Sequence, residues 1–339
     1  MPHRIVVACL GLVLAVASAR AADEASLVRI TYGEGWDALP ALIAIERGFF
    51  HDEGLVASGM AVTSAEAVIQ SLVAGSSDFA VVPQRTLMVM AAADVPIKVV
   101  ALSGWNTRTE LVVRKDLGEI DSVAALKGRT IAVARGAQAH PVLIRLLNAE
   151  GLAPSDVKIE MLAPRDLASA LERSAADAIF ASGHYTTRVV GEGAGRVLVS
   201  HEALVEKIGY VGAIPLVTSN QIIEERPDFA RRVLRAWLGA LRHIQTNRED
   251  AAKVLQIFFH RQGVPVGDEQ SQAWVGMTRW DRHVWTDSDV ADAEYNAWGL
   301  KVGGILKLQP SLGAFMEPRF AREASAALRA PDAATGDQP

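Results

Sequence analysis

The chain has 339 residues, of which 50% are apolar, 22% charged and 6% aromatic, and its formal net charge is −5. This length exceeds what one hydrophobic core usually fills, so two lobes are expected, and the apolar content excludes an intrinsically disordered chain. A single cysteine excludes a disulfide scaffold, and the lack of a basic field argues against nucleic acid or anionic lipid as partners.

The first 21 residues, 1–21, have the layout of a secretory signal peptide. A short basic start precedes an apolar stretch at 5–17, and alanines at 19 and 21 suit a cleavage site. The apolar stretch is shorter than the roughly 20 residues that a membrane-spanning helix needs. Cys9 lies within this stretch rather than at the cut, which argues against lipidation. We therefore expect a cysteine-free mature chain that is periplasmic and not membrane-embedded.

Short β-rich runs alternate with helical patterns along the mature chain. This alternation is typical of βαβ units and a mainly parallel sheet, so the fold class is α/β. The first series predicts strands at 28–32, 78–82 and 97–102, and helices at 39–47 and 63–74.

A second series of the same kind begins after 111–116. A long amphipathic helix follows it at 227–248, and the residues from 328 onward are expected to form a frayed tail. The second series predicts strands at 130–133, 158–162 and 178–181. It also predicts helices at 122–127 and 164–173, and a further helix between them that ends at 150.

Short catalytic and metal-binding motifs are absent from the sequence. It contains no Gly-x-Ser-x-Gly elbow, no phosphate loop ending in Gly-Lys-Ser/Thr and no His-Glu-x-x-His. The histidines are scattered, and none pairs with another at metal-ligand spacing. The glycines at 191–195 lack the dinucleotide-binding spacing and are interpreted as a loop. The pattern favours binding over catalysis, and we expect no enzyme activity, no cofactor and no metal.

Two predicted helix starts are candidate anion sites. Free amides and the positive end of a helix dipole lie at Thr63-Ser64 and at Gly136-Ala137-Gln138, although water fills most such ends. Thr63-Ser64-Ala65-Glu66 is interpreted as a capping box with Thr63 at the N-cap. In an open α/β sheet, ligands bind where strands end and helices begin.

Aromatic and basic residues follow several predicted strands. Trp36 and Trp105 are placed to stack on a ligand or to pack between lobes. Arg85 and Arg108 are suited to binding a carboxylate or sulfonate with two hydrogen bonds, or are solvated surface residues. His140 is interpreted as a hydrogen-bonding residue at a helix start rather than a catalytic base.

Six motifs occur in the order that they have in one known family. In this order, and behind a signal peptide, they resemble the periplasmic solute-binding proteins of ABC importers for sulfonate, nitrate, taurine and pyrimidine precursors. The resemblance runs from about Val28 to Ala326. The motifs are GFFHDEGL (48–55), AGSSDFA (74–80), PIKVVA (96–101), LVVRKD (111–116), LKGRTIAV (126–133) and GAQAH (136–140).

The resemblance implies a type II periplasmic-binding-protein fold, with two α/β lobes and a ligand cleft between them. The chain would cross between lobes twice, and hinge closure would present both lobes to an ABC permease and its ATPase. We expect a monomer. The implied division is a signal peptide at 1–21, lobe one at 22–112 plus 214–326, lobe two at 113–213, and a flexible tail at 327–339.

The resemblance also implies that the ligand is contacted by the loop at Trp36-Asp37, the helix start at Thr63-Ser64, the loop at Gln84-Arg85 and the helix start at Gly136-Ala137-Gln138. After the strand that ends at Ala181, many members carry an aromatic residue, an acid and a proline, where this chain has Ser182-Gly183-His184-Tyr185. The candidate ligand-binding residues are Trp36, Asp37, Thr63, Ser64, Gln84, Arg85, Trp105, Arg108, Gly136, Ala137, Gln138, His140, Ser182 and Tyr185.

The expected function is capture of a small organic or inorganic anion for import. One alternative is a pyrimidine or other flat heterocycle held between Trp36, Trp105 and Tyr185. Another is a periplasmic sensor that hands its ligand to a receptor. An enzyme on this fold, like the branch that makes a thiamine pyrimidine, is disfavoured because that branch is intracellular and carries a cysteine near its site, whereas the mature chain has none.

Overall fold

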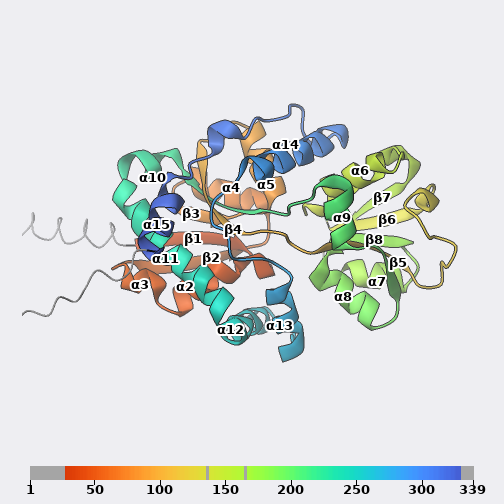
Figure 1. Cartoon of the computed structure of the whole chain (residues 1–339), viewed down its shortest axis with the longest axis horizontal. Coiled ribbons are helices and arrows are strands. Elements are labelled where there is room, and N and C mark those ends of the chain that lie inside the picture. Colours follow the sequence, from red (N-terminus) through yellow and green to blue (C-terminus); the bar gives the residue numbers. More distant parts are fainter. Residues whose placement is uncertain (1–26, 135–136, 164–165, 330–339) are drawn as a thin grey trace, which may run out of the picture.

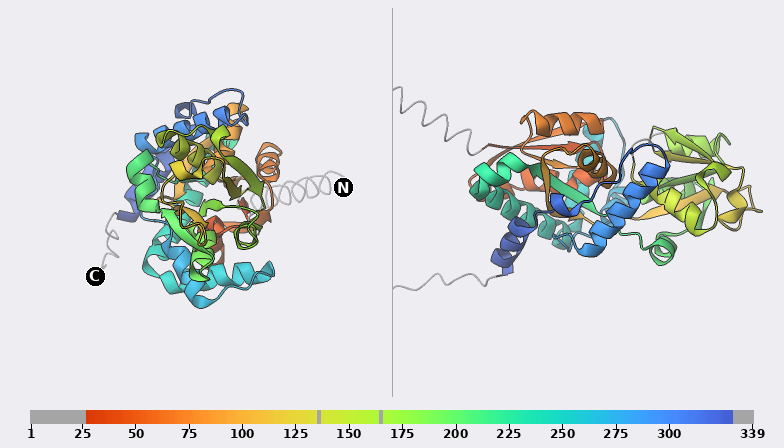
Figure 2. Two further views of the ribbon diagram at one scale, coloured as in Figure 1. Left: turned by 90° about the vertical axis from the view of Figure 1, so that its right-hand side faces the viewer. Right: turned by 90° about the horizontal axis from the view of Figure 1, so that it is seen from above.

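The computed structural model describes residues 27–134, 137–163 and 166–329. The predicted signal peptide and Gly136 lie outside this part of the chain. The described strands form two five-stranded sheets, and Figures 1 and 2 show each sheet with its helices as a separate lobe. The expectation of two α/β lobes is confirmed.

The sheet of lobe one is assembled from two distant parts of the chain. Its strand order is β2-β1-β3-β10-β4, with β1 parallel to β2 and β3, and β10 antiparallel to β3 and β4. The carboxyl ends of β1, β2 and β3 therefore meet at one edge. The strands are β1 (Leu27–Gly33), β2 (Val56–Val62), β3 (Phe79–Val81), β4 (Ile97–Gly104) and β10 (Ile214–Ser219).

The sheet of lobe two comes from one continuous part of the chain. Its order is β7-β6-β8-β5-β9, with β6 parallel to β7 and β8. Residues 109–112 belong to this sheet rather than to lobe one, because they pair antiparallel with β8. The strands are β5 (Thr109–Arg114), β6 (Thr130–Ala134), β7 (Lys158–Leu162), β8 (Ala178–Ser182) and β9 (Gly195–Val199).

Helices cover both sheets. Those of lobe one are η1 (Trp36–Ala38), α2 (Leu39–Glu46), α3 (Phe49–Asp52), α4 (Ala65–Val73), α5 (Gln84–Ala92), α10 (Asn220–Glu225), α11 (Pro227–Thr246), α12 (Arg248–Arg261), α13 (Asp268–Gly276), α14 (Asp287–Val302), η5 (Gly313–Phe315) and α15 (Arg319–Arg329). Those of lobe two are η2 (Ala124–Leu126), α6 (Ala139–Ala149), η3 (Pro154–Asp156), α7 (Leu167–Glu172), α8 (Gly183–Gly191) and α9 (His201–Ile208).

Three predicted segments differ in detail. The helix predicted at 122–127 is only the single 3-10 turn η2, because Lys127 turns to an extended conformation with ψ 126°. The helix predicted at 164–173 is described only as α7. Helix α15 continues to Arg329, so the first residues of the predicted tail, 327–329, are helical.

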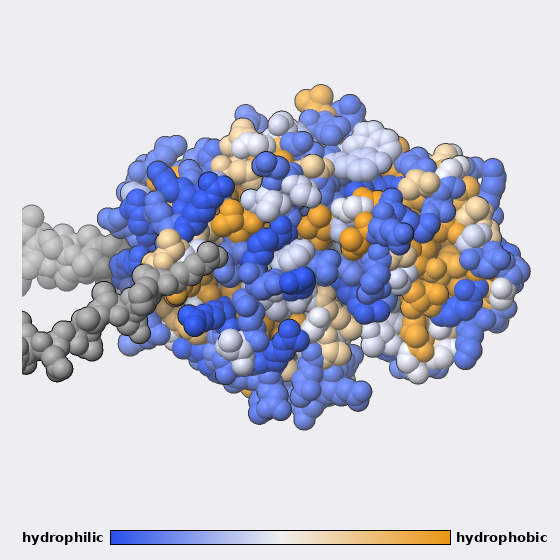
Figure 3. Space-filling view, in the orientation of Figure 1, coloured by the Kyte–Doolittle hydropathy of each residue, from blue (hydrophilic) through white to orange (hydrophobic). Residues whose placement is uncertain are grey.

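Apolar side chains fill the interior of both lobes. Trp237 of α11 is fully buried, and so are Phe79 on β3 and Phe180 on β8. The face drawn in Figure 3 is largely hydrophilic, with apolar residues in small patches. The amphipathic pattern predicted for 227–248 therefore corresponds to a helix that buries one face in lobe one.

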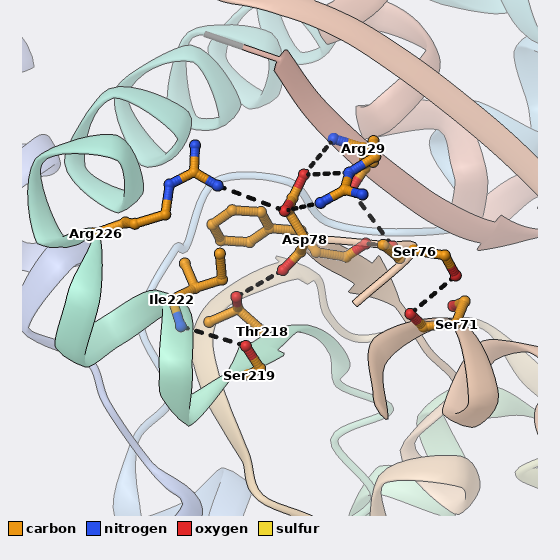
Figure 4. A network of polar contacts seen from close by, with 10 residues as sticks. Arg29, Ser71, Ser76, Asp78, Thr218, Ser219, Ile222 and Arg226 are labelled. Atoms are coloured by element: carbon orange, nitrogen blue, oxygen red, sulfur yellow. Dashed lines mark hydrogen bonds and ion pairs between the residues drawn. The ribbon is translucent and has the colours of Figure 1, made fainter. Parts of the chain in front are cut away.

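The buried carboxylate of Asp78 connects several elements of lobe one. It lies at the sheet edge opposite the carboxyl ends of β1 and β3. Arg29 donates to it from Nε at 3.1 Å and from a terminal nitrogen at 2.8 Å, and Arg226 lies 3.8 Å away (Figure 4). The backbone oxygen of Asp78 accepts a hydrogen bond from Thr218 Oγ1 at 2.6 Å. These bonds join β1, β3 and β10 to the start of α11.

Helix α14 of lobe one packs against α6 of lobe two (Figure 1). Arg145 of α6 donates to Asp292 Oδ1 at 2.5 Å and to Asn296 Oδ1 at 2.6 Å, and the Arg145 and Asp292 side chains are each only 2% exposed. A Cβ on Gly299 would lie 3.0 Å from the carbonyl oxygen of Pro141, so glycine allows the close approach of the helices. Burial raises the pKa of Asp292, and the charge of Arg145 opposes that rise.

Candidate functional site

A small pocket that is open to solvent lies between the lobes. The carboxyl edge of the first sheet supplies Trp36, the chain crossing supplies Arg108, and the end of β8 supplies Ser182, so three predicted site residues meet here. The crossing is held by two backbone hydrogen bonds, from Arg108 N to Met277 O at 2.9 Å and from Gly183 N to Arg108 O at 2.8 Å. The full lining is Trp36, Thr107, Arg108, Ser182, Gly183, Trp274 and Met277.

Arg108 enters the pocket with its charge already paired. Its Nε donates to Glu110 Oε1 at 2.8 Å, and the Glu110 side chain is only 4% exposed. Thr186 Oγ1 donates to the other oxygen of Glu110 at 2.5 Å. Glu110 was not among the predicted site residues, although an acid inside the apolar strand at 109–114 is a signal for a buried ion pair.

Trp36 and Asp37 form the short helix η1 directly after β1. The Trp36 ring packs edge-on against Trp280 at a centroid distance of 6.2 Å, so Trp36 packs within lobe one and also lines the pocket. Asp37 is half-buried, and burial raises its pKa to about 6. The Asp37 charge also contributes to the raised pKa of Tyr185, about 12, for which burial is the larger cause. The two predicted residues, on different lobes, are therefore close enough for the Asp37 charge to act on Tyr185.

Gln84 and Gln138 meet between the lobes. Gln138 at the N-cap of α6 donates from Nε2 to Gln84 Oε1 at 2.6 Å, and Asn296 Nδ2 donates to the same oxygen at 2.9 Å. Asn296 is connected in turn to Arg145. The predicted site residues Gln84 and Gln138 are thus hydrogen-bonded to the buried polar residues between α6 and α14. The contact between these two helices was not predicted from the sequence.

Arg85 is half-buried in the first turn of α5. Within the described ranges it makes no hydrogen bond and no ion pair, and burial lowers its pKa, with a smaller opposing effect from Glu66. His140, at the start of α6 in the other lobe, is close enough that the charge of Arg85 lowers the pKa of His140. Arg85 is therefore a guanidinium at the lobe interface with unused donors.

The start of α4 differs from the predicted capping box. Ser64, not Thr63, is the N-cap: its Oγ accepts from Ala67 N at 3.1 Å, and its backbone is extended. The helix begins one residue later than predicted, which places Glu66 at the second helical position and leaves Thr63 outside. Thr63 and Ser64 are both exposed. Ala137, at the other predicted helix start, donates its backbone N–H to Ala134 O at 3.1 Å.

Trp105 makes its contacts within lobe one. Its Nε1 donates to Asp281 Oδ1 at 2.9 Å, and the guanidinium groups of Arg279 and Arg282 lie 4.7 and 4.2 Å from its ring centroids. It does not line the pocket between the lobes. The Trp105 ring lies against these two guanidinium groups. Stacking of Trp105 on a ligand therefore stays a prediction.

His140 is expected to make the protein less stable in mild acid. Burial, assisted by the charge of Arg85, lowers the pKa of His140 to about 4 from 6.5. Between these values the unfolded chain binds more protons, so stability is lost as the pH falls from 6.5 toward 4. This group contributes about 3 kcal/mol to that loss. The raised pKa of Asp37 acts in the opposite sense below pH 6.

The variant His140→Gln isolates this contribution. Urea unfolding at pH 7 and pH 4.5 should show a smaller loss of unfolding free energy for the variant than for the wild type. Equal losses in the two proteins would mean that His140 titrates normally.

The described residues contain no group of three or more acidic, histidine or cysteine side chains arranged to hold a metal ion. Among the helices that the structure describes, none is long and apolar enough to cross a membrane.

Solved structures share this fold. The periplasmic aliphatic sulphonate binding protein SsuA of Escherichia coli superposes with a TM-score of 0.74 at 18% identity, over 86% of this chain and 97% of that one. The desulfurization enzyme DSZB superposes with a TM-score of 0.64 at 16% identity, over 89% of this chain and 100% of that one. The likeness to binding proteins confirms the predicted fold class, and it shows that the same fold also carries an enzyme.

Curated relatives match most of the chain. A Bacillus subtilis (strain 168) protein, named for binding aliphatic sulfonates, is 28% identical over 70% of this chain and 71% of its own length. The taurine-binding periplasmic protein of Escherichia coli (strain K12) is 25% identical over 75% of this chain and 79% of its own length. The model of the family described as NMT1/THI5 like matches residues 36–251. The chain belongs to the NMT1/THI5-like family.

Proposed function

We propose that this protein is the periplasmic substrate-binding component of an ABC importer. It captures a small organic or inorganic anion between its lobes and delivers it to a membrane permease that works with an ATPase. The observation that carries the proposal is Arg85, a half-buried guanidinium without a protein partner in the described ranges, next to His140 of the opposite lobe.

An anion is the ligand that this arrangement favours. A guanidinium removed from water and left unpaired destabilises the protein, and a bound sulfonate or carboxylate would supply two charge-assisted hydrogen bonds. His140 is neutral at pH 7 because of its lowered pKa, so it adds no charge but can add a hydrogen bond. Because Arg85 and His140 lie on different lobes, a ligand between them would favour the closed arrangement.

The names of the relatives support the same class of ligand. They assign aliphatic sulfonates to one relative and taurine to another, and the sulphonate-binding neighbour is periplasmic by its title. The signal peptide predicted at 1–21 is consistent with that location. Transport, rather than sensing, is the function that we adopt from the family.

Two alternatives are less well supported. An aromatic slot for a flat heterocycle would need Trp105, whose ring lies against two guanidinium groups. Catalysis like that of the structurally similar enzyme has no support from a nucleophilic cysteine, because the one cysteine, Cys9, lies in the predicted signal peptide.

A thermal-shift screen tests the proposal. The exported protein, freed of co-purified ligand, is heated with alkanesulfonates, nitrate, bicarbonate, aromatic carboxylates and pyrimidines. A ligand at 100 times its dissociation constant adds about 2.7 kcal/mol, which corresponds to a rise in melting temperature of about 5–10 °C. We expect this rise with one class of anion. A rise with pyrimidines alone would contradict the proposal.

A further inference from the structure

The chain passes between the lobes through two segments that lie side by side. The first, 105–108, joins β4 to β5, and the second, 209–213, joins α9 to β10. Asn106 donates its backbone N–H to Val211 O at 2.7 Å, which ties one segment to the other. A rotation of one lobe against the other must change the backbone of these segments, so we call the two together the hinge.

Three residues of the hinge have a positive φ. They are Asn106 at 54°, Gly209 at 61° and Gly212 at 59°. Asparagine adopts this left-handed conformation less readily than glycine, and it keeps the conformation only where the surrounding contacts hold it. The backbone at Asn106 is therefore the strained part of the hinge, and its conformation depends on the groups that bind it.

His201, the first residue of α9, bonds to the hinge with both ring nitrogens. Helix α9 lies at the end of lobe two nearest to lobe one (Figure 1). Nδ1 of His201 accepts from the backbone N–H of Thr109 at 3.4 Å, and Nε2 lies 3.0 Å from Asn106 Oδ1. The ring packs edge-on against Tyr210 at a centroid distance of 5.9 Å, and the Tyr210 hydroxyl is neutral because burial raises its pKa. One side chain of lobe two thus contacts both segments of the hinge.

These contacts require a neutral imidazole with its proton on Nε2. Because the Thr109 N–H is a donor, Nδ1 must be unprotonated to accept from it, and Nε2 then carries the proton and donates to Asn106 Oδ1. Protonation of Nδ1 turns this acceptor into a donor. The amide of Thr109, a residue only 2% exposed, then loses the acceptor, which makes the contact unfavourable.

Charged groups act on His201 from its own helix and from the elements packed against it. Burial has the largest effect on the pKa of His201 and lowers it from 6.5; the charges of Glu202 and Glu110 raise this pKa, and that of Arg108 lowers it. Helix α6, which packs against α9, contributes Arg145, whose charge is already paired. A ring released into water would regain an ordinary pKa, so protonation favours the released ring as the pH falls below 6.5.

We propose that His201 holds the hinge in a pH-dependent way: the neutral ring joins lobe two to both segments, and protonation of Nδ1 releases them. This inference goes beyond the proposed function and does not depend on which ligand is bound. A hinge released in acid allows the lobes to separate more readily, which favours the open arrangement over the closed one.

Amide hydrogen exchange of the ligand-free exported protein tests the proposal. Exchange is followed by NMR at pH 7.5 and pH 4.5 and corrected at each pH for the intrinsic rate of an unfolded chain. We expect the protection of the Asn106 and Thr109 amides to fall about tenfold at pH 4.5, the effect of losing one hydrogen bond, while the amides of 131–133 in β6 keep theirs. Equal protection of Thr109 at both pH values would overturn the proposal. An equal loss in the hinge and in β6 would also overturn it, because the loss would then be global unfolding.

Two variants assign the effect to His201. His201→Asn places an amide oxygen near the position of Nδ1 but cannot be protonated, so the protection of Thr109 should be the same at both pH values. His201→Phe keeps a ring without nitrogens, so protection should be low at both. His51→Gln removes an exposed histidine of α3 and should behave as the wild type does. If His201→Asn loses protection in acid as the wild type does, another group titrates and His201 has only a structural role. Each of these results leaves the proposed function in place, because no ligand is present.

Discussion

Replacing Arg145 with methionine is expected to lower the free energy of unfolding by about 3–5 kcal/mol. The change leaves the buried carboxylate of Asp292 without its cation and removes the donor from Asn296 Oδ1. Because Arg145 and Asp292 lie on helices of different lobes, the change weakens the contact between α6 and α14 that joins the lobes. Urea unfolding followed by tryptophan fluorescence measures the effect.

The loss of unfolding free energy caused by Arg145→Met should be smaller at acidic pH. Burial already raises the pKa of Asp292 above its ordinary 3.8, and Arg145 opposes the rise, so the variant raises this pKa further. A carboxyl group with a raised folded pKa adds stability at low pH, which is lost as the pH rises through that pKa. The variant should therefore differ most from the wild type at pH 8 and least near pH 4.

Two comparisons show whether the buried pair is responsible. Lys207→Met breaks an ion pair with Glu150 whose lysine is 44% exposed, so it should lower stability by no more than about 1 kcal/mol. Arg145→Met combined with Asp292→Leu removes both charges and should recover part of the loss. A loss in Arg145→Met as small as that in Lys207→Met would contradict the buried contact between α6 and α14.

The strands with continuous apolar runs could be predicted from the sequence. Residues 131–133 and 178–181 are apolar and buried on both faces of their sheet, and both runs lie in strands of the structure. Strand β2 was missed because it is an edge strand with exposed side chains, including Val56 at 60% and Met60 at 44%. An edge strand of this kind depends on pairing with β1, and its sequence carries little of that information.

Only those site residues that directly follow a predicted strand or begin a predicted helix could be predicted from the sequence. Trp36 and Arg85 were proposed because they follow strands, and parallel strands bring such residues to one edge. The hydrogen bond between Gln84 and Gln138 depends on how the lobes are placed. No local pattern encodes that placement.

The buried polar residues of α14 were the hardest to anticipate. Asp292 and Asn296 lie one helical turn apart, in a segment whose polar composition suggests a solvated helix, yet both are buried. They are buried because Arg145, more than 140 residues earlier in the chain, supplies their hydrogen bonds. A polar residue at the surface and a polar residue paired in the interior look the same until the partner is known.

Replacing Arg85 with alanine is expected to weaken anion binding by about 2–3 kcal/mol, which is about 30- to 150-fold in dissociation constant. The guanidinium has no partner within the described residues, so its donors are free for a sulfonate or carboxylate. Calorimetric titration with the anion that gives the largest thermal shift measures the change. Arg85→Lys keeps the charge but not the planar fork and should lie between the wild type and Arg85→Ala.

The stability of the Arg85→Ala variant separates a binding role from a structural one. Burial lowers the pKa of Arg85, which means that the charged guanidinium destabilises the folded protein. Removing the side chain should therefore leave the melting temperature unchanged or higher. Affinity and stability would then move in opposite directions, which a merely structural arginine does not produce. Arg242→Ala, on the exposed face of α11, removes an equal charge and should leave the dissociation constant unchanged. If Arg85→Ala binds the anion as tightly as Arg242→Ala does, the anion lies elsewhere in the cleft and Arg108 becomes the residue to test.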